Sequence, residues 1–364
     1  MIYLDNAATT PICDAAKKAI IEHFDDFGNP SSSNQVGHKA LMLIEDARER
    51  IAKCINAEPD EIYFTSGGSE ANTWALHRRS AWASSIEHHS IYSLRLYTTI
   101  NNSGIVSVND LEQIVRKPIG YKLDIISCMA VNNEIGTIQP IKNLAHMSHH
   151  NGYLFHTDAV QAMAYMPIDV KDIKCDMLSA SGHKFGAPKG TGFLYIRNGL
   201  HMNPLIYGGK QERLLRGGTE NVLGIIAMAA ALEDTIEHMD ERNKYIKSLR
   251  DDLMFNLIKD DGITINGSIN PNERVPSNIN IQINGVKGDD VVAMCDQYGI
   301  CISAGSACNE GVAKPSHVLK AIGLTDEEAL SSIRITLGHQ NTPEEINYVC
   351  DILPKIIQRL RKIT

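Results

Sequence analysis

Short apolar runs alternate with amphipathic segments along the first 200 residues of the chain. Two segments, residues 108–115 and 141–150, have the apolar spacing of helices. The runs that are typical of buried strands are residues 61–65, 123–127, 153–157 and 176–180. This alternation predicts an α/β fold with a mostly parallel sheet covered by helices on both faces. Ligands of such sheets bind beyond the carboxyl ends of the strands, where residues 65–69, Asp158 and residues 181–184 fall.

A different pattern follows this region. Residues 221–259 have continuous helical character, with an apolar first half that should be buried, in the core or at a subunit interface, and a charged, solvated second half at 240–244. A second alternation then predicts strands at 277–283 and 333–337, a helix at 289–298, and a closing helix that is capped at Thr342 and begins with Pro343. We therefore predict a large domain over residues 15–240 and a smaller α+β domain formed by residues 1–14 and 241–364.

Length and composition narrow the class of protein. The chain has 364 residues, which is more than a single hydrophobic core usually accommodates, so two domains are expected. Its net charge of −8 lacks the basic excess of a protein that binds nucleic acid directly. It contains no run of eighteen apolar residues, and its first residues do not resemble a signal peptide. None of the eight cysteines forms a C-x-x-C pair, so neither a metal site nor a disulfide framework is favoured. A cytoplasmic enzyme with reduced thiols is expected.

Lys184 and Asp158 are the first candidates for chemistry. Lys184 stands in a glycine-punctuated turn directly after a strand, and Asp158 ends another strand. Taken singly, they read as a solvated loop lysine and a helix N-cap. Taken together, they fit pyridoxal phosphate, because an amine forms a Schiff base with an aldehyde and a carboxylate pairs with a protonated pyridine nitrogen.

Three further turns could complete a cofactor site. Residues 66–70, which include Gly68 and Ser69, join a strand to a helix, where backbone amides can bind phosphate. His88 stands at a strand-to-helix junction, where an imidazole could stack on a planar ring. Asn133 follows a strand and could bond a ring hydroxyl. Each of these segments is also ordinary turn or capping chemistry when considered alone.

Cys308 and Arg334 could act on a substrate. Cys308 is flanked by small and polar residues, which predicts a mobile, accessible loop of the kind that a reactive thiol needs. Cys54, Cys128 and Cys295 lie in apolar runs and are read as core residues. Arg334 interrupts an apolar strand, so it needs an anion, either a substrate carboxylate or a structural salt-bridge partner.

The ordered set of these motifs resembles the cysteine desulfurases, a branch of the class V aminotransferases within the fold-type I pyridoxal phosphate enzymes. The resemblance runs nearly end to end and is carried by residues 3–11, 28–32, 64–67, 132–136, 183–184, 216–219, 305–308 and 334–338. The Ser-Ala-Cys sequence at 306–308 is similar to the subgroup that has a longer, flexible catalytic loop. Asn34, Ala187 and Lys210 stand where the family commonly has histidine, glycine and glycine.

The resemblance implies a role for each candidate. Lys184 would bind pyridoxal phosphate covalently and move the substrate's α-proton, and His88 would stack on the cofactor ring. Cys308 would attack the sulfur of L-cysteine and hold it as a persulfide, leaving L-alanine. The other implied contacts are Asp158 with the ring nitrogen, Gln161 and Asn133 with the ring oxygen side, Gly68, Ser69, Ser181 and His183 with the phosphate, Thr219 with the phosphate of the neighbouring subunit, and Arg334, Asn6 and Ala7 with the amino acid.

These roles imply a homodimer with shared active sites and a protein that accepts the sulfur. The acceptor could be an iron–sulfur scaffold, a tRNA-thiolation relay or a DNA phosphorothioation system. Selenocysteine lyase and other class V enzymes are the alternative activities. A catalytically silent scaffold is disfavoured, because Lys184, Asp158 and Cys308 are all present.

Overall fold

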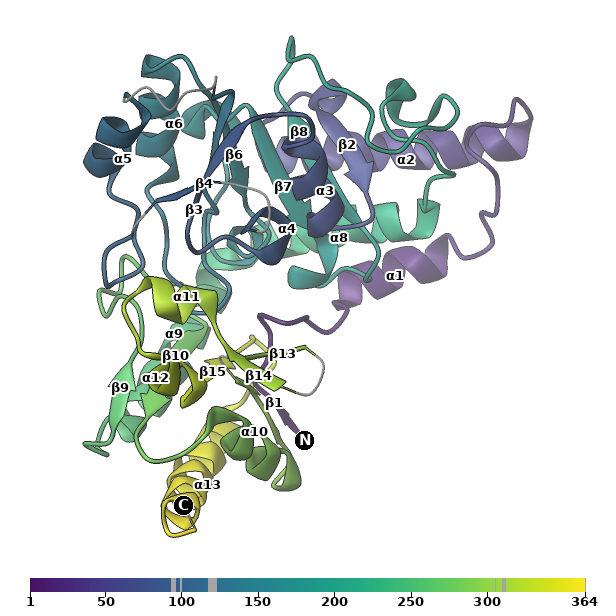
Figure 1. The fold of residues 1–364 in the computed structure, drawn as a ribbon. Coiled ribbons are helices and arrows are strands. Elements are labelled where there is room, and N and C mark those ends of the chain that lie inside the picture. The colour runs from purple at the N-terminus through teal and green to yellow at the C-terminus, as the bar shows by residue number, and fades with distance from the viewer. Residues whose placement is uncertain (93–95, 99, 117–122, 305, 310–311, 364) are drawn as a thin grey trace.

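The computed structural model describes residues 1–364 apart from 93–95, 99, 117–122, 305, 310–311 and 364, and the side chains of 92, 96–98, 306–309, 312 and 313 also lie outside the description. A seven-stranded sheet organises the first part of the chain (Figure 1), and its β8 runs antiparallel to both neighbours while the other pairs are parallel. In spatial order the strands are β2 (Ile62–Thr65), β8 (Gly192–Ile196), β7 (Met177–Ser181), β6 (Leu154–Asp158), β5 (Ile125–Ser127), β3 (Ala81–Ser84) and β4 (Leu96–Thr98).

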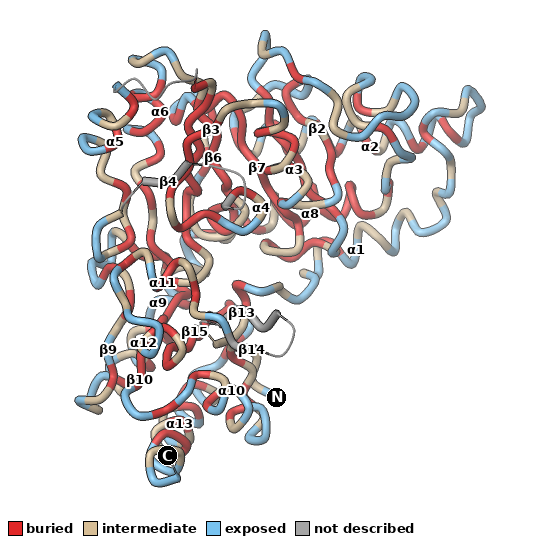
Figure 2. Tube along the Cα trace, viewed as in Figure 1, coloured by how far each residue is buried: buried red, intermediate tan, exposed pale blue. Residues whose placement is uncertain are grey.

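Helices cover both faces of this sheet, because successive strand residues point to opposite sides. Ile126 and Phe193 pack with α2, α6 and α8 on one face, and Ile125 and Leu194 pack with α3 on the other. The helices of this region are α1 (Asp14–Glu22), α2 (Gln35–Cys54), α3 (Gly68–Ala75), α4 (His89–Tyr92), α5 (Val108–Val115), α6 (Ile141–His150), α7 (Val170–Ile173) and α8 (Val222–Glu237), with 3-10 turns at Pro59–Glu61, Ala162–Ala164, Gly182–Lys184 and Gln211–Leu214. The predicted α/β fold with a mostly parallel sheet is confirmed. Figure 2 shows the buried residues concentrated along these strands and the helix faces that cover them.

The second part of the chain has its own apolar cluster. Its four-stranded sheet has the order β12-β15-β10-β9, and Leu4 of the N-terminal segment packs into the same cluster. In the same N-terminal segment, β1 pairs with β11 in parallel. The elements are β1 (Ile2–Tyr3), α9 (Met239–Leu257), β9 (Ile263–Ile265), β10 (Asn278–Ile283), α10 (Gly288–Gln297), β11 (Ile300–Cys301), β12 (Ser303–Ala304), β13 (Ser306–Asn309), β14 (Val312–Pro315), α11 (His317–Ala321), α12 (Asp326–Leu330), β15 (Ser332–Thr336) and α13 (Pro343–Arg361).

The prediction of one continuous helix over residues 221–259 is wrong, because the helix is interrupted. The chain forms two helices, α8 and α9, which meet at His238, whose backbone is not helical. The apolar α8 is buried within the chain between α1, α2 and the sheet. The break lets α9 leave the large sheet and pack Leu249 and Leu253 into the second apolar cluster.

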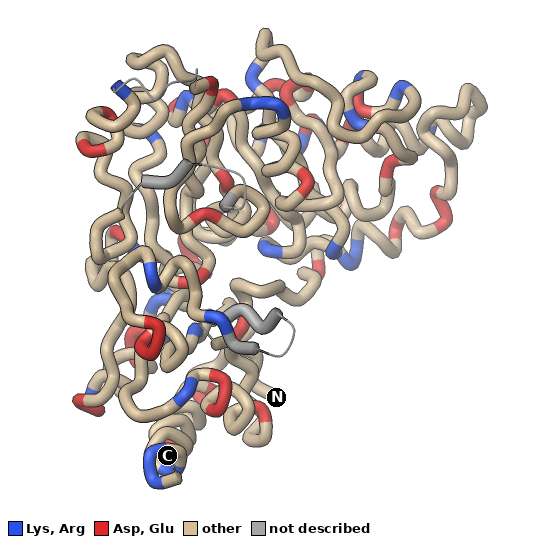
Figure 3. Tube along the Cα trace, viewed as in Figure 1, with Lys and Arg blue, Asp and Glu red and all other residues tan. Residues whose placement is uncertain are grey.

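Local capping agrees with the sequence at several helix ends. Thr342 and Glu345 form the expected capping box of α13. Asn34, one of the departures from the family pattern, caps α2 by accepting a bond from the amide of Gly37 at 2.9 Å. Basic and acidic residues are interspersed along the trace in Figure 3. Among the residues that the structure describes, no helix is long and apolar enough to cross a membrane.

Candidate active site

A cavity of about 320 Å3 lies where the carboxyl ends of β6 and β7 meet the N-terminus of α3. The topology makes this place, since parallel strands bring their carboxyl ends to one edge of the sheet. The predicted residues that line this cavity are Ala7, Gly68, Ser69, His88, Asn133, Asp158, Gln161, Ser181, His183, Lys184 and Arg334. Segments that are distant in sequence are therefore brought together as expected.

Two glycines shape the turn before α3. Gly67 has φ of +149°, a conformation that side chains disfavour, and a Cβ on Gly68 would lie 2.6 Å from Cγ2 of Val160. Gly68 and Ser69 at the N-terminus of α3 line the cavity together with Ser181, and a helix N-terminus is a favourable place for a phosphate.

Asp158 is held in place by a short polar network. It is 4% exposed. Its Oδ1 accepts from the amide of Val160 at 2.9 Å, and its Oδ2 accepts from Nδ2 of Asn72 at 2.6 Å. The same Nδ2 donates to Oγ of Ser90 at 3.0 Å, and this oxygen lies 2.8 Å from Nδ1 of His88. Asn72 therefore ties the carboxylate to the imidazole.

Both histidines at the cavity are held towards the neutral form. Partial burial lowers the pKa of His88, with the charges of His89 and Lys184 acting in the same direction and Asp158 opposing them. Burial, followed by the charges of Lys184 and Lys189, lowers the pKa of His183 to about 4. A neutral ring at His88 can lie against an electron-poor aromatic cofactor without adding a positive charge.

Lys184 is poised as a nucleophilic amine. Its Nζ donates to the carbonyl oxygens of Ala7 at 2.6 Å and Ala8 at 2.7 Å. Burial, followed by the charge of Arg334, lowers the pKa of Lys184 to about 8. Gln161 also donates to the carbonyl of Ala7, at 2.9 Å. The side chains of Lys184 and Gln161, which follow β7 and β6, thus both hold the N-terminal segment at the cavity.

Arg334 has a structural partner and a remaining donor. Its Nη2 donates to Oδ1 of Asp5 at 2.7 Å and its Nη1 donates to the carbonyl of Asn133 at 3.1 Å. Its buried Nε has no hydrogen-bond partner among the residues that the structure describes. The salt bridge that the sequence left open is therefore present, and Arg334 also lines the cavity.

Cys308 lies in one strand of a hairpin, and the mobility and accessibility predicted for its loop stay predictions. Its backbone belongs to β13, which pairs antiparallel with β14 and places Cys308 opposite Ala313. A run of small residues gives no alternating apolar signal, so the pairing could not be recognised from the pattern. The Cys308 side chain lies outside the described residues.

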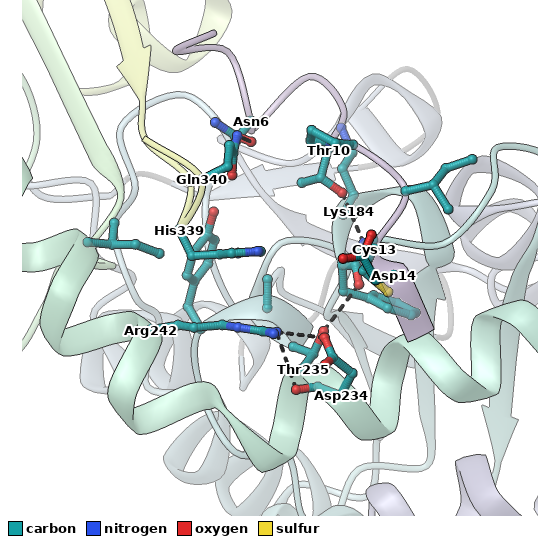
Figure 4. A pocket seen from close by; sticks show the side chains of 18 of the residues that line it. Asn6, Thr10, Cys13, Asp14, Lys184, Asp234, Thr235, Arg242, His339 and Gln340 are labelled. Atoms are coloured by element: carbon teal, nitrogen blue, oxygen red, sulfur yellow. Dashed lines mark hydrogen bonds and ion pairs between the residues drawn. The ribbon is translucent and has the colours of Figure 1, made fainter. Parts of the chain in front are cut away.

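Asn6 and Thr219 line different cavities. Asn6 is buried, donates to the carbonyl of Thr336 at 2.9 Å and accepts from Gln340 at 2.9 Å. With Lys184 it lines a neighbouring cavity of about 380 Å3, where Figure 4 shows Asn6 beside Gln340. Thr219 is exposed and lines a separate hollow beside Arg216.

Sequence reasoning missed Asn72, Ser90 and Glu87. Asn72 follows Gly68 by four residues, so helical spacing could have placed it on the same face. Glu87 is fully buried, and its Oε1 accepts from Oγ of Ser84 and from the amide of Met129. Burial raises the pKa of Glu87 to about 8. No sequence signal marks a carboxyl group whose pKa is raised by burial in this way.

The residues present fit pyridoxal phosphate. An amine of lowered pKa, a buried carboxylate, an imidazole and a glycine-lined helix N-terminus face one cavity of about 320 Å3. These are the groups that an aldehyde, a pyridine nitrogen, a planar ring and a phosphate need. Among the described residues, no group of three or more potential metal ligands exists.

Comparisons with known proteins agree with this chemistry. Residues 2–349 match the family model described as aminotransferase class-V. The chain is 39% identical to the cysteine desulfurase IscS of Methanosarcina thermophila, over 100% of this chain and 93% of that protein. A NifS-like protein from Rickettsia africae has a TM-score of 0.90 at 32% identity and covers 98% of this chain and 99% of its own. A structure described as SspA in complex with cysteine has a TM-score of 0.78 at 33% identity, over 94% of this chain and 100% of its own.

Proposed function

Because the chain belongs to the aminotransferase class-V family, among the cysteine desulfurases, we propose that its cavity converts L-cysteine to L-alanine with transfer of sulfur to Cys308. The enzyme is dependent on pyridoxal phosphate. The observation that carries the assignment is the convergence of Lys184, Asp158, His88 and Arg334 on one cavity at the carboxyl ends of the strands.

The chain's own groups divide the work of holding the cofactor. Lys184 is the covalent anchor, Asp158 the partner of the ring nitrogen and His88 the ring platform. When bound, pyridoxal phosphate supplies an aldehyde for amine capture and an electron-withdrawing ring. We assign the phosphate to Gly68, Ser69, Ser181 and His183, and the ring oxygen side to Asn133 and Gln161.

The substrate is oriented by Arg334. Arg334 lines the cavity and offers its guanidinium charge to the substrate carboxylate, while Asp5 and the Asn133 carbonyl keep the guanidinium in place. Ala7 lines the same cavity, and Asn6 holds the N-terminal segment by donating to the backbone carbonyl of Thr336. Lys184 Nζ, with a pKa lowered to about 8, can accept the α-proton near neutral pH.

Cys308 receives the sulfur. In this step the Cys308 thiolate forms the new S–S bond, the Cβ–S bond of the substrate breaks, and its electron pair remains with the carbon skeleton that becomes alanine. A second acceptor must then take the sulfur from Cys308 for turnover, and we propose a protein for this role. The cysteines that the structure describes are free, which fits the reducing cytoplasm that we propose as the compartment.

We also propose a homodimer in which Thr219 reaches the phosphate of the partner's site. Thr219 is exposed and does not line the cofactor cavity of its own chain. Gln211 donates to Oγ of Ser31 at 3.3 Å, which brings these two segments together, and large apolar side chains are exposed along or near both segments. These side chains are Ile21, Phe24, Phe27, Val36, Met42, Tyr207 and Leu214.

Replacing Cys308 tests the assignment. Cys308→Ser substitutes a hydroxyl that is not ionised at neutral pH, so persulfide formation should stop. Cofactor absorbance and the spectral response to L-cysteine should remain, because they depend on Lys184 and its neighbours. Mass spectrometry of the wild type after brief exposure to L-cysteine should show one added sulfur on the peptide that bears Cys308. Alanine and sulfide at the wild-type rate in Cys308→Ser would refute the mechanism.

A further inference from the structure

The hairpin that bears Cys308 ends at a helix cap on the edge of the cofactor cavity. Pro315, the last residue of β14, pairs with Ser306 at the start of β13. Ser316 follows directly and caps α11, accepting from the amides of Val318 at 3.1 Å and Leu319 at 3.3 Å. The end of the hairpin is therefore fixed by whatever holds Ser316 and α11.

Ser316 has a second bond, to the segment that carries Asn133. Its Oγ donates to Oε2 of Glu134 at 2.5 Å. The backbone carbonyl of Glu134 accepts from the side-chain Nδ2 atoms of Asn278 at 2.9 Å and Asn280 at 3.1 Å, two residues of β10. The preceding carbonyl accepts from Arg334. Glu134 thus joins the end of the hairpin to the segment that also holds the substrate-binding arginine.

His317 makes a parallel link to the segment that carries His88. Its Nε2 lies 2.9 Å from the backbone carbonyl of Glu87, an acceptor only, so Nε2 donates. Burial lowers the pKa of His317 to about 4, so the ring is neutral at working pH and its Nε2 carries the proton. The rings of His317 and His89 are 4.9 Å apart. The second bond therefore ends one residue away from the proposed ring platform.

An apolar cluster closes the same junction. Val318, Leu319 and Ile322 of the α11 region pack with Ile86, Met129 and Ile135, which flank the His88 and Asn133 segments. Moving the end of the hairpin away from the cavity would break both hydrogen bonds and expose this cluster. The hydrogen bonds of Ser316 and His317 fix the orientation of α11 at this junction, because apolar contacts alone would let the helix slide.

We propose that Ser316 and His317 are positioning residues for sulfur transfer: through Glu134 and the Glu87 carbonyl they hold the end of the β13–β14 hairpin so that Cys308 meets the substrate sulfur. The inference rests on the proposed nucleophilic role of Cys308. It assigns to this junction a function in the persulfide step that cofactor binding does not require.

Substitutions at Ser316 separate this role from helix capping. Ser316→Asp keeps a good N-cap acceptor but has no hydroxyl to donate to Glu134, whereas Ser316→Thr keeps both functions. Glu134→Gln alone keeps an oxygen that accepts from Ser316. Combined with Ser316→Asp, Glu134→Gln supplies an amide donor to the introduced carboxylate and should restore the bond. For the second link, His317→Gln keeps a donor and His317→Phe removes it.

The assay is single-turnover persulfide formation on the Cys308 peptide of the holoenzyme at pH 8, followed by mass spectrometry. Ser316→Asp and His317→Phe should slow this step about ten-fold or more, as expected for loss of a hydrogen bond that orients the nucleophile. Visible cofactor absorbance and the concentration of L-cysteine that half-saturates the spectral change should stay at wild-type values. Ser316→Thr, His317→Gln and the Ser316→Asp/Glu134→Gln pair should recover most of the rate.

Wild-type persulfide rates in both Ser316→Asp and His317→Phe would overturn the proposal. So would equal losses of cofactor absorbance and persulfide rate with no recovery in the paired variant, since that pattern means simple destabilisation. Failure of the underlying function is recognised separately, because Cys308→Ser would then still transfer sulfur.

Discussion

Lys184 should react with pyridoxal phosphate as an amine whose pKa is about 8. The ordinary lysine value of 10.5 is lowered mainly by burial and then by the charge of Arg334. A difference of about 2.5 pKa units corresponds to a preference for the neutral amine of about 3.4 kcal/mol. At pH 7.5 about a quarter of the Lys184 amines would be neutral, against about one in a thousand at the ordinary value.

The assay is the rate at which cofactor-free protein gains visible absorbance on mixing with pyridoxal phosphate between pH 6.5 and 10. Only the neutral amine attacks an aldehyde, so the rate should rise about ten-fold per pH unit below the pKa and level off above about 8. Borohydride trapping and peptide mapping should place the adduct on Lys184. The reaction of a free lysine analogue, measured in parallel, supplies the unperturbed profile.

Arg334→Met gives the matched perturbation. It removes the nearby cation that lowers the pKa of Lys184, and it leaves Asp5, whose charge raises that pKa, without its ion-pair partner. The plateau of the rate should therefore shift to higher pH. The shift should be smaller than the difference between the ordinary lysine pKa and the value of about 8, because burial is the largest cause of the lowering. A wild-type profile that keeps rising to pH 10, or an Arg334→Met profile that shifts downwards, would refute this account of Lys184.

Three further predictions follow from the buried groups and the proposed dimer. Burial raises the pKa of Glu87 to about 8, so the folded protein holds a proton that the unfolded chain loses near pH 4.5, and wild-type stability falls as the pH rises between these values. Glu87→Gln should remove this dependence, so that in denaturant unfolding the variant gains up to about 5 kcal/mol relative to the wild type by pH 8. Parallel curves of stability against pH for the two proteins would contradict this prediction. Glu212 accepts from Arg48 at 2.8 Å and 2.9 Å with both side chains buried. Glu212→Gln should lower the free energy of unfolding by about 3 kcal/mol, because the buried guanidinium then keeps only the half-exposed Glu45 as an ionic partner. Replacing both Glu212 and Arg48 by methionine should cost less, and equal costs would contradict this account. Coexpressed Lys184→Ala and Thr219→Ala subunits should form mixed dimers with one intact site, restoring about a quarter of wild-type sites, and a fully active monomer would exclude shared sites.

Local rules determined much of the fold. The helices predicted at 108–115 and 141–150 have the bounds of α5 and α6. The predicted strands also lie within one residue of β6 and β7, because alternation and flanking turns are properties of neighbouring residues. The convergence of Gly68, Asp158 and Lys184 followed from the same reasoning, since parallel strands fix where their carboxyl ends lie.

Other features depend on segments that are far apart in sequence. The break at His238 is set by two apolar clusters that pull α8 and α9 to different sheets. The hairpin around Cys308 is specified by backbone pairing between β13, whose small residues carry no periodic signal, and β14.

The sequence by itself determined the class of sheet, the boundaries of several strands and helices and the identity of the residues at the strand ends, because periodicity, capping and strand direction act locally. Only the tertiary structure decided that Asn72 joins Asp158 to the His88 network, that Asp5 fixes Arg334, and that Glu134 holds Ser316. The last two pairs span 329 and 182 positions of the chain. Such bonds form only when packing has already brought their segments together, and a hydrogen bond or ion pair leaves no periodic trace in either segment.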